Sequence, residues 1–360
     1  MRTIVSVSTL ALFIGLQIAV TPLLAQEGEN EGGPKPAGLF KRSDTLTVTM
    51  TAPWGDLQRK EGYQGTYPGK INYTDELGNN VTLDMTAERR GITRQKVCRY
   101  PPIKLRFEKD AVKGTTFRGQ KSLKVVTHCQ KSSRYEQYYI VEMLIYRMYN
   151  LITEKSFRIR PLNVTYTDGE SGRSDDDRFA FLIEDDSDVA KRNGVKKLKV
   201  PKVRTTQLDL QTSSEFALFQ FMIGNTDWAA LSGPDPKECC HNVKLIGPEP
   251  FQKDDIAYPV PYDFDSAGLV DADYAAPYDG LPIRKVTQRL YRGYCRHNST
   301  LNDARDLFLE REKAIIALLD EEPLLVSRSK NKAENYLERF FEILKDDKDF
   351  NKLVIEKCRK

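Results

Sequence analysis

The chain has 360 residues, 40% of them hydrophobic and 29% charged, which is typical of a globular protein with one bilobed domain or two small ones. Its 55 basic and 51 acidic residues almost balance, at a net charge of +4. This argues against a dedicated nucleic-acid-binding protein, because the only long basic tract, KRNGVKKLKVPKVR, is typical of a solvated loop.

The N-terminus has the pattern of a secretory signal peptide. A basic residue precedes the apolar run 10–20, and a small residue, Ala25, follows it. We expect a signal peptide at 1–25 and a Gly/Pro-rich linker at 26–43, with an uncleaved membrane anchor as the weaker alternative. The pattern predicts an extracytoplasmic protein (periplasmic, secreted or on the cell surface) with no membrane span after cleavage.

Six cysteines follow the signal segment, and at least one disulfide is expected. The sequence does not fix the pairing. The proposed pairs are Cys98 with Cys129, and one of the adjacent Cys239 and Cys240 with Cys295. The adjacent cysteines are more typical of a structural disulfide than of a redox centre. A zinc site is not favoured, because no second pair of ligands has a suitable spacing.

The first half of the chain is predicted to be rich in strands. Alternating apolar and polar residues indicate strands at 44–52, 70–85 (a hairpin turning at 77–80), 103–107, 121–126, 157–168 and 177–185. One helix interrupts them: Ser133 and Glu136 form a predicted capping box ahead of a helix at 136–152. This helix is apolar on most sides, so its Glu142 is expected to be buried and to need a cationic partner, from Arg147 or a lysine.

The second half is predicted to be mainly helical. A helix ends at Gly224, and further helices are expected at 303–320, 331–345 and in a short last segment. The predicted fold class is α+β, with a β-rich N-lobe at 44–195 and a mainly helical C-lobe at 196–360.

Acidic and amide side chains follow the ends of predicted elements. Asp227 follows a helix, Asn242 opens a strand, and Asp263 and Asp265 close another in the stretch PYDFD. A catalytic aspartate together with amide and carboxylate oxygens that bind Mg²⁺ is what phosphoryl transfer requires. The sequence therefore predicts Asp227 as the catalytic residue and the other three as metal ligands, with Mg²⁺ or Mn²⁺ compensating the two buried acids.

A nucleotide-binding half is predicted for the same site. A strand lysine paired with Glu142 would hold the α- and β-phosphates of ATP, and both Lys104 and Lys124 are candidates. Glu184 ends the strand that would lead into a hinge, where backbone groups could meet the adenine edge.

These segments resemble the CotH-type (spore coat protein H) atypical kinases, and more remotely the HipA-type and secretory-pathway kinases. The family pattern of N-x-D-R, a later Asn and W/Y-D-x-D corresponds to NTDW at 225–228, to Asn242 and to YDFD at 262–265, and ERRG at 88–91 also fits. The resemblance covers about 44–300 and implies a protein-kinase-like fold that uses ATP and Mg²⁺, with Asp227 as catalytic aspartate. Trp228 stands where the family usually has a basic residue.

Four functions are weighed. The first is an exported ATP-dependent kinase that phosphorylates a protein or a glycan. The alternatives are a catalytically silent kinase-fold binding protein, a surface structural module whose acids hold a cation, and a glycosyltransferase with a DxD motif. A calcium-binding loop at DFDSAG is excluded, because Ala267 and Tyr274 stand where acidic ligands would be needed.

Overall fold

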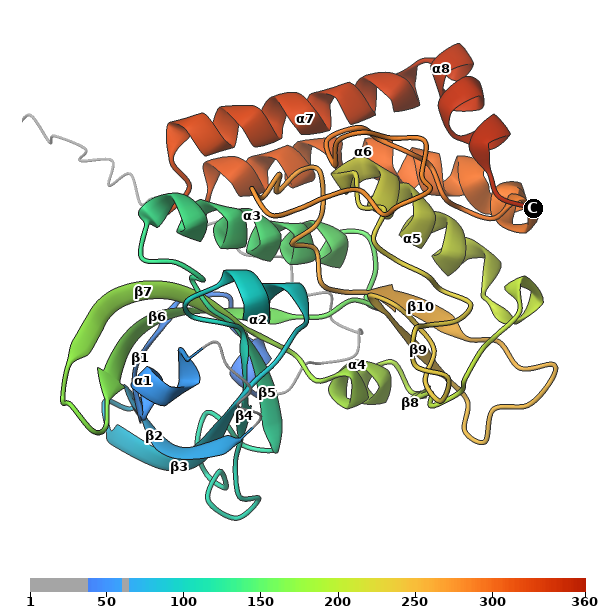
Figure 1. Ribbon diagram of the computed structural model, residues 1–360. Helices are drawn as coiled ribbons and strands as arrows, with labels where there is room; N and C mark the ends of the chain where they lie inside the picture. The colour runs from blue at the N-terminus through green and yellow to red at the C-terminus, as the bar shows by residue number, and fades with distance from the viewer. Residues whose placement is uncertain (1–37, 60–64) are drawn as a thin grey trace, which may run out of the picture. The chain divides into compact units, whose positions relative to one another are not determined.

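The computed structural model describes residues 38–59 and 65–360, all of which belong to one compact unit, Pro34–Lys360. A β-barrel is followed along the chain by a region rich in helices (Figure 1). The predicted signal peptide at 1–25 and most of the linker lie outside the described residues. None of the helices in the described ranges is both long and apolar enough to span a bilayer.

Seven strands form a closed barrel. They are β1 (Leu46–Ala52), β2 (Thr66–Thr74), β3 (Asn80–Arg89), β4 (Ile103–Arg106), β5 (Ser122–Val126), β6 (Ile159–Asp168) and β7 (Ser174–Ile183). The order is β1-β2-β3-β4-β5-β7-β6, and the barrel closes where β6 runs parallel to β1, with Leu46 beside Leu162. The other six pairings are antiparallel.

This closure corrects the predicted fold class. The expectation of a bilobed, protein-kinase-like fold with a β-sheet N-lobe is wrong, because the N-terminal strands form a closed mixed barrel with a helical region attached. The strands lie close to where alternation predicted them. Alternation assigns faces to strands but does not say which strand edges pair, and the β1–β6 pairing joins segments more than a hundred residues apart.

The barrel has its own core, built by alternate residues of each strand. Val48, Met50 and Ala52 of β1 point inward, as do Leu83, Met85 and Ala87 of β3. Side chains of strand residues alternate between faces, so one apolar residue in two fills a small barrel. The strand β7 differs because both its faces are buried: Ala180 and Leu182 face the barrel core, whereas Phe179, Phe181 and Ile183 belong to the second core.

The helix α3 (Ser133–Asn150) covers the barrel at β6 and β7 (Figure 1). Eleven of its residues are buried, including Glu142, as expected for a helix that is apolar on most sides. The predicted capping box is wrong: the N-cap is Ser132, and no side chain caps this end.

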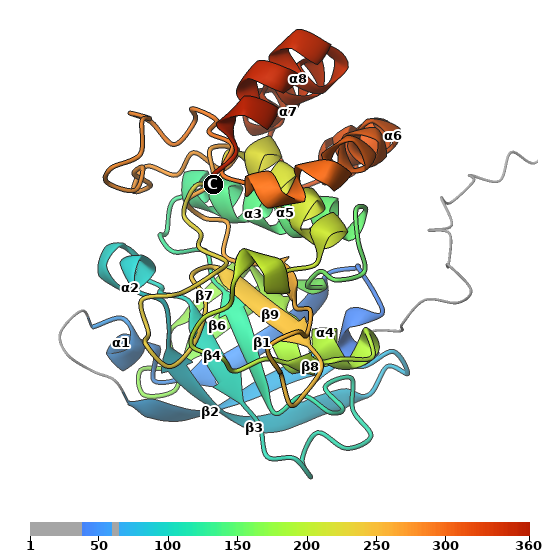
Figure 2. The same cartoon turned by 90° about the vertical axis from the view of Figure 1, so that its right-hand side faces the viewer.

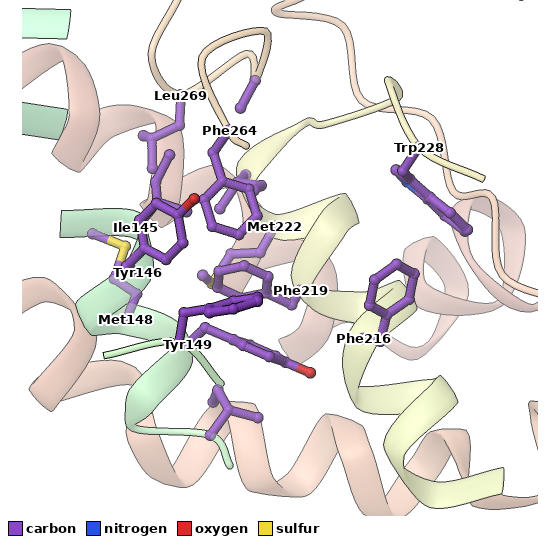
Figure 3. Packing of buried hydrophobic residues seen from close by; sticks show 14 of the residues in the cluster. Ile145, Tyr146, Met148, Tyr149, Phe216, Phe219, Met222, Trp228, Phe264 and Leu269 are labelled. Atoms are coloured by element: carbon purple, nitrogen blue, oxygen red, sulfur yellow. The ribbon is translucent and has the colours of Figure 1, made fainter. Parts of the chain in front are cut away.

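The helical region packs on the other side of α3. Its main helices are α5 (Leu210–Ile223), α6 (Leu301–Asp320), α7 (Ser327–Lys345) and α8 (Asp347–Leu353). Gly224 ends α5 in the left-handed conformation, with φ of 66°, as predicted. Aromatic rings join α5 to α3: the rings of Tyr149 and Phe219 lie 4.4 Å apart between centroids (Figure 3).

Short elements complete the unit. They are η1 (Gly38–Phe40), α1 (Trp54–Leu57), α2 (Thr93–Val97), α4 (Asp186–Arg192), η2 (Thr205–Gln207), η3 (Cys295–Thr300) and η4 (Ile355–Lys357), with a small sheet of β8 (Lys196–Lys197), β9 (Val243–Gly247) and β10 (Tyr258–Pro261). The sheet order is β10-β9-β8, and β8 and β9 lie beside α4 (Figure 2). Two loops matter for the site: the turn before β9 carries Asn242, and the turn after β10 carries Asp263.

Three disulfides are present. The Cys98–Cys129 pair confirms the prediction. The predicted link from the adjacent cysteines to Cys295 is wrong: Cys239 pairs with Cys240, and Cys295 pairs with Cys358 near the C-terminus. Three disulfides fit a protein that folds in an oxidising, extracytoplasmic environment.

Candidate functional site

The charge of the two acids in PYDFD is compensated by an arginine, Arg94. Its Nη2 lies 2.7 Å from Asp263 Oδ1, and its Nε lies 3.1 Å from Asp265 Oδ2. Its Nη1 also lies 3.2 Å from Oε2 of Glu142 on α3. The expected pairing of Glu142 with Lys104, Lys124 or Arg147 is therefore corrected. We call Arg94, Glu142, Asp263 and Asp265 the acid–arginine cluster.

The position of Arg94 follows from its short helix. Arg94 lies on α2, which ends just before Cys98, and the disulfide to Cys129 fixes that end to the segment after β5. The backbone N–H of Tyr100 donates to the carbonyl of Cys129, which adds a second tie. A helix of five residues is not stable alone, so these links and the buried ion pairs hold Arg94 in place.

The loop after β10 holds its acids by burying the residue between them. Phe264 is fully buried and packs on Tyr146 of α3, with ring centroids 4.7 Å apart, and on Phe219 of α5 (Figure 3). The hydroxyl of Tyr146 accepts a hydrogen bond from the backbone N–H of Asp263. Asp263 itself has a positive φ of 63°, as does Asn242 with a φ of 51°, a conformation that aspartate and asparagine adopt more readily than other residues with a Cβ.

The acid–arginine cluster has an excess of negative charge. Three carboxylates share one guanidinium, so two negative charges are unmatched when all three are ionised. Burial raises the pKa of Glu142 and the pKa of Asp265. The pKa of Asp263 is instead lowered, because the charge of Arg94 and then that of Arg90 outweigh its burial. Asp263 is thus the carboxylate most strongly held in its ionised form.

Asp227 lies in a second group of polar side chains beside this cluster. Its Oδ1 is 2.8 Å from Nε2 of His241, and its Oδ2 accepts a hydrogen bond from Nδ2 of Asn242 at 3.0 Å. The hydrogen bond with Asp227 raises the pKa of His241. Asn225 Oδ1 accepts from the backbone N–H of Asp227 and shapes the turn that follows α5.

The two groups meet at the start of β9 and the end of β10. The backbone N–H of Tyr262 donates to the carbonyl of Asn242, so Asp263 follows directly beside Asn242. The charge of Asp227 also raises the pKa of Asp265, and the charge of Asp263 raises the pKa of His241. Side chains 227, 242 and 263, far apart along the chain, therefore lie in one place.

Two oxygens of this group have no partner in the described chain. Asn242 donates through Nδ2, which leaves its Oδ1 free, and Asp263 uses only Oδ1 to bind Arg94. Asp263 keeps 24% of its side chain exposed. Asp265 differs: Arg94 and the Tyr274 hydroxyl occupy Oδ2, and Ser266 donates to Oδ1.

Among the described residues, no three His, Cys, Asp or Glu side chains gather closely enough to hold a metal ion. The two free oxygens, on Asn242 and Asp263, are of the amide and carboxylate types that Mg²⁺ takes as protein ligands.

Three cations gather next to these acids, and two of them, Arg90 and Lys124, form no ion pair with a described residue. Lys124 on β5 has no hydrogen bond or ion pair to any described residue, and its Nζ lies 4.8 Å from the ring centroid of Tyr262. Burial, and then the charge of Arg90, lower the pKa of Lys124 to about 8. Nη1 of Arg90 is buried without a hydrogen-bond partner. Lys244 also lies over Tyr262, at 5.4 Å, and pairs with Glu238 at 3.4 Å. We call Arg90, Lys124 and Lys244 the basic cluster.

The other two predicted nucleotide-binding residues have protein partners. Lys104 lies directly across from Lys124 in the β4–β5 pair and is 3.8 Å from Glu88. Glu184 is fully buried and pairs with Arg192 at 3.1 Å, while its backbone N–H donates to the carbonyl of Arg158. That N–H is therefore not free to bind an adenine edge.

Sequence reasoning missed Arg94, Arg90 and His241. Arg90 belongs to the ERRG segment on which the family resemblance partly rests. The sequence therefore drew attention to this segment but did not indicate that Arg90 is a cation without an ion pair. Arg94 stands in ITRQKV, which shows no periodicity or motif, and only its ion pairs reveal it.

Searches against models of known families, characterised proteins and solved structures return no match for this chain. The fold and the site alone therefore define its class: a closed mixed β-barrel joined to a helical region, with an acidic site and a basic cluster beside each other.

Proposed function

We propose that this protein is an exported, CotH-like phosphotransferase that moves the γ-phosphoryl group of ATP to a hydroxyl of a protein or glycan, with Mg²⁺ or Mn²⁺. The proposal concerns the chemistry of the site and does not depend on a kinase-like architecture. The observation that carries it is that two opposite excesses of charge lie near each other: the free oxygens of Asp263 and Asn242 on one side, and the unpaired cations Arg90 and Lys124, whose charges act on the pKa of Asp263, on the other.

A metal–nucleotide complex matches this arrangement. The unpaired charges of Arg90 and Lys124 suit the phosphates, and the free oxygens of Asn242 and Asp263 suit the metal ion. A bound Mg²⁺ or Mn²⁺ would neutralise phosphate charge during transfer. Unmatched charges of one sign are unfavourable in a partly buried site, so a ligand that supplies both opposite charges would be bound.

Asp227 takes the role of proton acceptor in this proposal. The acceptor hydroxyl loses its proton to the carboxylate, its oxygen bonds to the γ-phosphorus, and ADP leaves with the electrons of the broken bond. His241 and Asn242 hold the carboxylate from two sides, which fixes its orientation. Asp265 and Glu142 hold Arg94, and Arg94 holds Asp263.

A second candidate is a nucleotide-binding protein without turnover. The observation that favours it is that Arg94 already occupies one oxygen of Asp263 and one of Asp265. An arginine that neutralises the acids would weaken the binding of a metal ion there without preventing the basic cluster from holding phosphate.

The test combines ligand-induced stabilisation with label transfer. Thermal unfolding is measured with ATP and Mg²⁺ or Mn²⁺ together and separately, and γ-labelled ATP is used to follow phosphate transfer to the chain or to water. At a ligand concentration 100 times Kd, stabilisation of about 2.7 kcal/mol is expected. Asp263→Asn should abolish transfer, whereas Asp84→Asn, on the exposed face of β3, should not.

Each result separates the candidates. Stabilisation with transfer supports the phosphotransferase. Stabilisation by nucleotide without transfer supports the silent binding protein, and stabilisation by metal alone supports a structural cation site. No response to nucleotide in any combination would reject both proposals.

A further inference from the structure

A pair of arginines lies against Trp228, next to the candidate catalytic Asp227. The guanidinium carbon of Arg292 is 5.1 Å from the Trp228 ring centroid, and that of Arg359 is 5.0 Å away. Arg359 also lies 4.3 Å from the ring centroid of Tyr294. We call Arg292 and Arg359 the arginine pair. It belongs to neither the acid–arginine cluster nor the basic cluster.

The arginine pair has no acidic partner within the described part of the chain. Neither guanidinium forms an ion pair there, and Nη2 of Arg359 is buried without any hydrogen-bond acceptor. Burial, and then the charge of Arg359, lower the pKa of Arg292 to about 10. Burial also lowers the pKa of Arg359. Two like charges held together at an aromatic surface would be stabilised by a bound anion.

The pair is fixed in place by the C-terminal segment. The Cys295–Cys358 disulfide joins that segment to η3, and the backbone N–H of Arg359 donates to the carbonyl of Gly293. Nε of Arg359 donates to the carbonyl of Arg292. Because both backbones and one nitrogen of each guanidinium, Nε of Arg359 and Nη1 of Arg292, are engaged, the remaining N–H groups are pre-oriented.

Arg292 connects the pair to the turn that carries Asp227. Its Nη1 donates to the carbonyls of Thr226 and Trp228, the residues on either side of Asp227. The charge of Asp227 also acts on Arg292, where it raises the pKa against the effect of burial. An anion held by the pair would therefore lie beside Asp227.

We propose that the arginine pair is an oxyanion-binding site that holds a carboxylate or phosphate group of the phosphoryl acceptor, so that the acceptor is an anionic molecule. Binding of an oxyanion follows from the pair alone, whereas the role in acceptor binding rests on the proposed phosphotransfer. Guanidinium groups suit this task because their planar N–H donors match the oxygens of carboxylate and phosphate.

The competing explanation is purely structural: the two arginines cap carbonyls and stack on Trp228 without binding a ligand. The two explanations differ in one measurable property. An oxyanion site binds inorganic phosphate through Arg359, whose buried Nη2 has no partner, while a structural clamp has no preference for phosphate over chloride at equal ionic strength.

The first experiment measures inorganic phosphate binding to the full-length protein by calorimetry, with chloride as the reference anion. All variants are made in a Lys124→Met background, which weakens the basic cluster as a competing site. Arg359→Gln should raise Kd for phosphate about tenfold or more, the loss of one charge-assisted hydrogen bond. Arg296→Gln is the matched control: it removes an exposed charge from the same region and should change Kd by about twofold or less.

The variant Arg359→Lys distinguishes a specific loss of phosphate binding from a folding defect. This variant keeps the charge but not the fork of donors, and it should bind phosphate with intermediate affinity. Equal phosphate affinity in the Arg359→Gln and Arg296→Gln proteins, or no phosphate binding in the Lys124→Met protein, would overturn the proposal.

The second experiment tests the role in acceptor binding. Label transfer is compared for a serine peptide flanked by glutamates, for the same peptide with a phosphoserine in place of one glutamate, and for one flanked by glutamines. If transfer to the anionic peptides exceeds transfer to the glutamine peptide, and Arg359→Gln removes this preference while ATP binding is unchanged, the role of the arginine pair in acceptor binding is supported. The preferred peptide then identifies carboxylate or phosphate as the group bound. Equal transfer to all three peptides refutes it. Phosphate binding at the pair without transfer to any peptide would leave the oxyanion site standing and reject the phosphotransfer function.

Discussion

Arg94 and Asp263 stand 169 residues apart in the chain, and their side chains lie 2.7 Å apart, with the guanidinium 5% exposed. This pair joins the barrel side of the molecule, through α2, to the loop after β10. A buried charge that loses its partner is strongly destabilising, so the ion pairs of Arg94 contribute to stability as well as to the site.

The acid–arginine cluster should respond unequally to loss of its members. Arg94→Gln is expected to reduce the free energy of unfolding by about 3–5 kcal/mol, because it leaves Glu142 and Asp265, both buried, and the partly exposed Asp263 without their shared cation. Glu142→Gln should reduce it by about 1 kcal/mol, because Arg94 keeps two partners and the excess negative charge falls. Urea unfolding at pH 7 measures both.

The control for this comparison is Lys70→Gln. Lys70 pairs with Asp84 at the surface, with side chains 61% and 84% exposed, and its loss should change stability by less than about 1 kcal/mol. Equal losses for Arg94→Gln and Glu142→Gln would show that Arg94 is not the shared cation of the cluster.

Lys124 should make stability rise with pH above 8. Its pKa is lowered to about 8 by burial and by Arg90, whereas the unfolded chain keeps this proton to a higher pH. The unfolded state therefore binds more protons in that interval, so the free energy of unfolding rises with pH there. Lys124→Met should remove that rise and be more stable than the wild type at pH 7.

The measurement is the difference in free energy of unfolding between wild type and variant, from pH 7.5 to 10. Lys104→Met, on the adjacent strand, should retain the rise seen in the wild type. A parallel pH profile for the Lys124→Met protein and the wild type would contradict the assignment.

The three histidines should titrate separately in NMR spectra. The hydrogen bond with Asp227 raises the pKa of His241, burial lowers that of His128 to about 3, and burial lowers that of His297. Asp227→Asn should bring the pKa of His241 down and leave the other two unchanged.

The stability that this pair contributes follows from the sign of the shift. A histidine whose folded pKa is raised stabilises the protein below its unfolded pKa, and the contribution disappears as pH rises through the folded pKa. The difference in stability between wild type and Asp227→Asn should therefore be larger at pH 5 than at pH 9. An unchanged difference would mean that His241 and Asp227 are not coupled.

The disulfides should differ in the stability they contribute. Replacing Cys98 and Cys129 by alanine opens a link between residues 31 apart, and a loss of about 3–4 kcal/mol is expected from the freed chain entropy. Replacing Cys239 and Cys240 opens a link between neighbours, which constrains almost no chain, so about 1 kcal/mol or less is expected.

Thermal and urea unfolding of the two double variants provide the comparison. The first variant should also weaken nucleotide-induced stabilisation, because the Cys98–Cys129 link fixes the end of α2, which carries Arg94. Equal losses in the two variants would argue against a role for loop length.

Local pattern was sufficient for much of the secondary structure. Alternation located the strands of the barrel, the apolar sides of α3 predicted that Glu142 is buried, and Gly224 marked the end of α5. The order of Asp227, Asn242 and Asp263 along the chain also predicted a shared site; Asn242 donates a hydrogen bond to Asp227, and its carbonyl accepts one from Tyr262, the residue before Asp263. These features depend on residues that are close together in sequence, or on residue types that have few alternative structural or chemical roles.

The remaining features depend on which distant segments meet. The sequence by itself determined the strands. Because the edges of every strand carry the same N–H and C=O groups, only the tertiary structure decided that β6 closes the barrel against β1. A buried carboxylate likewise predicts a cation but not its identity, because any cation brought within about 4 Å serves. The sequence determined that Glu142, Asp263 and Asp265 need a positive charge, and the packing of α2 against α3 and the loop after β10 made Arg94 that charge.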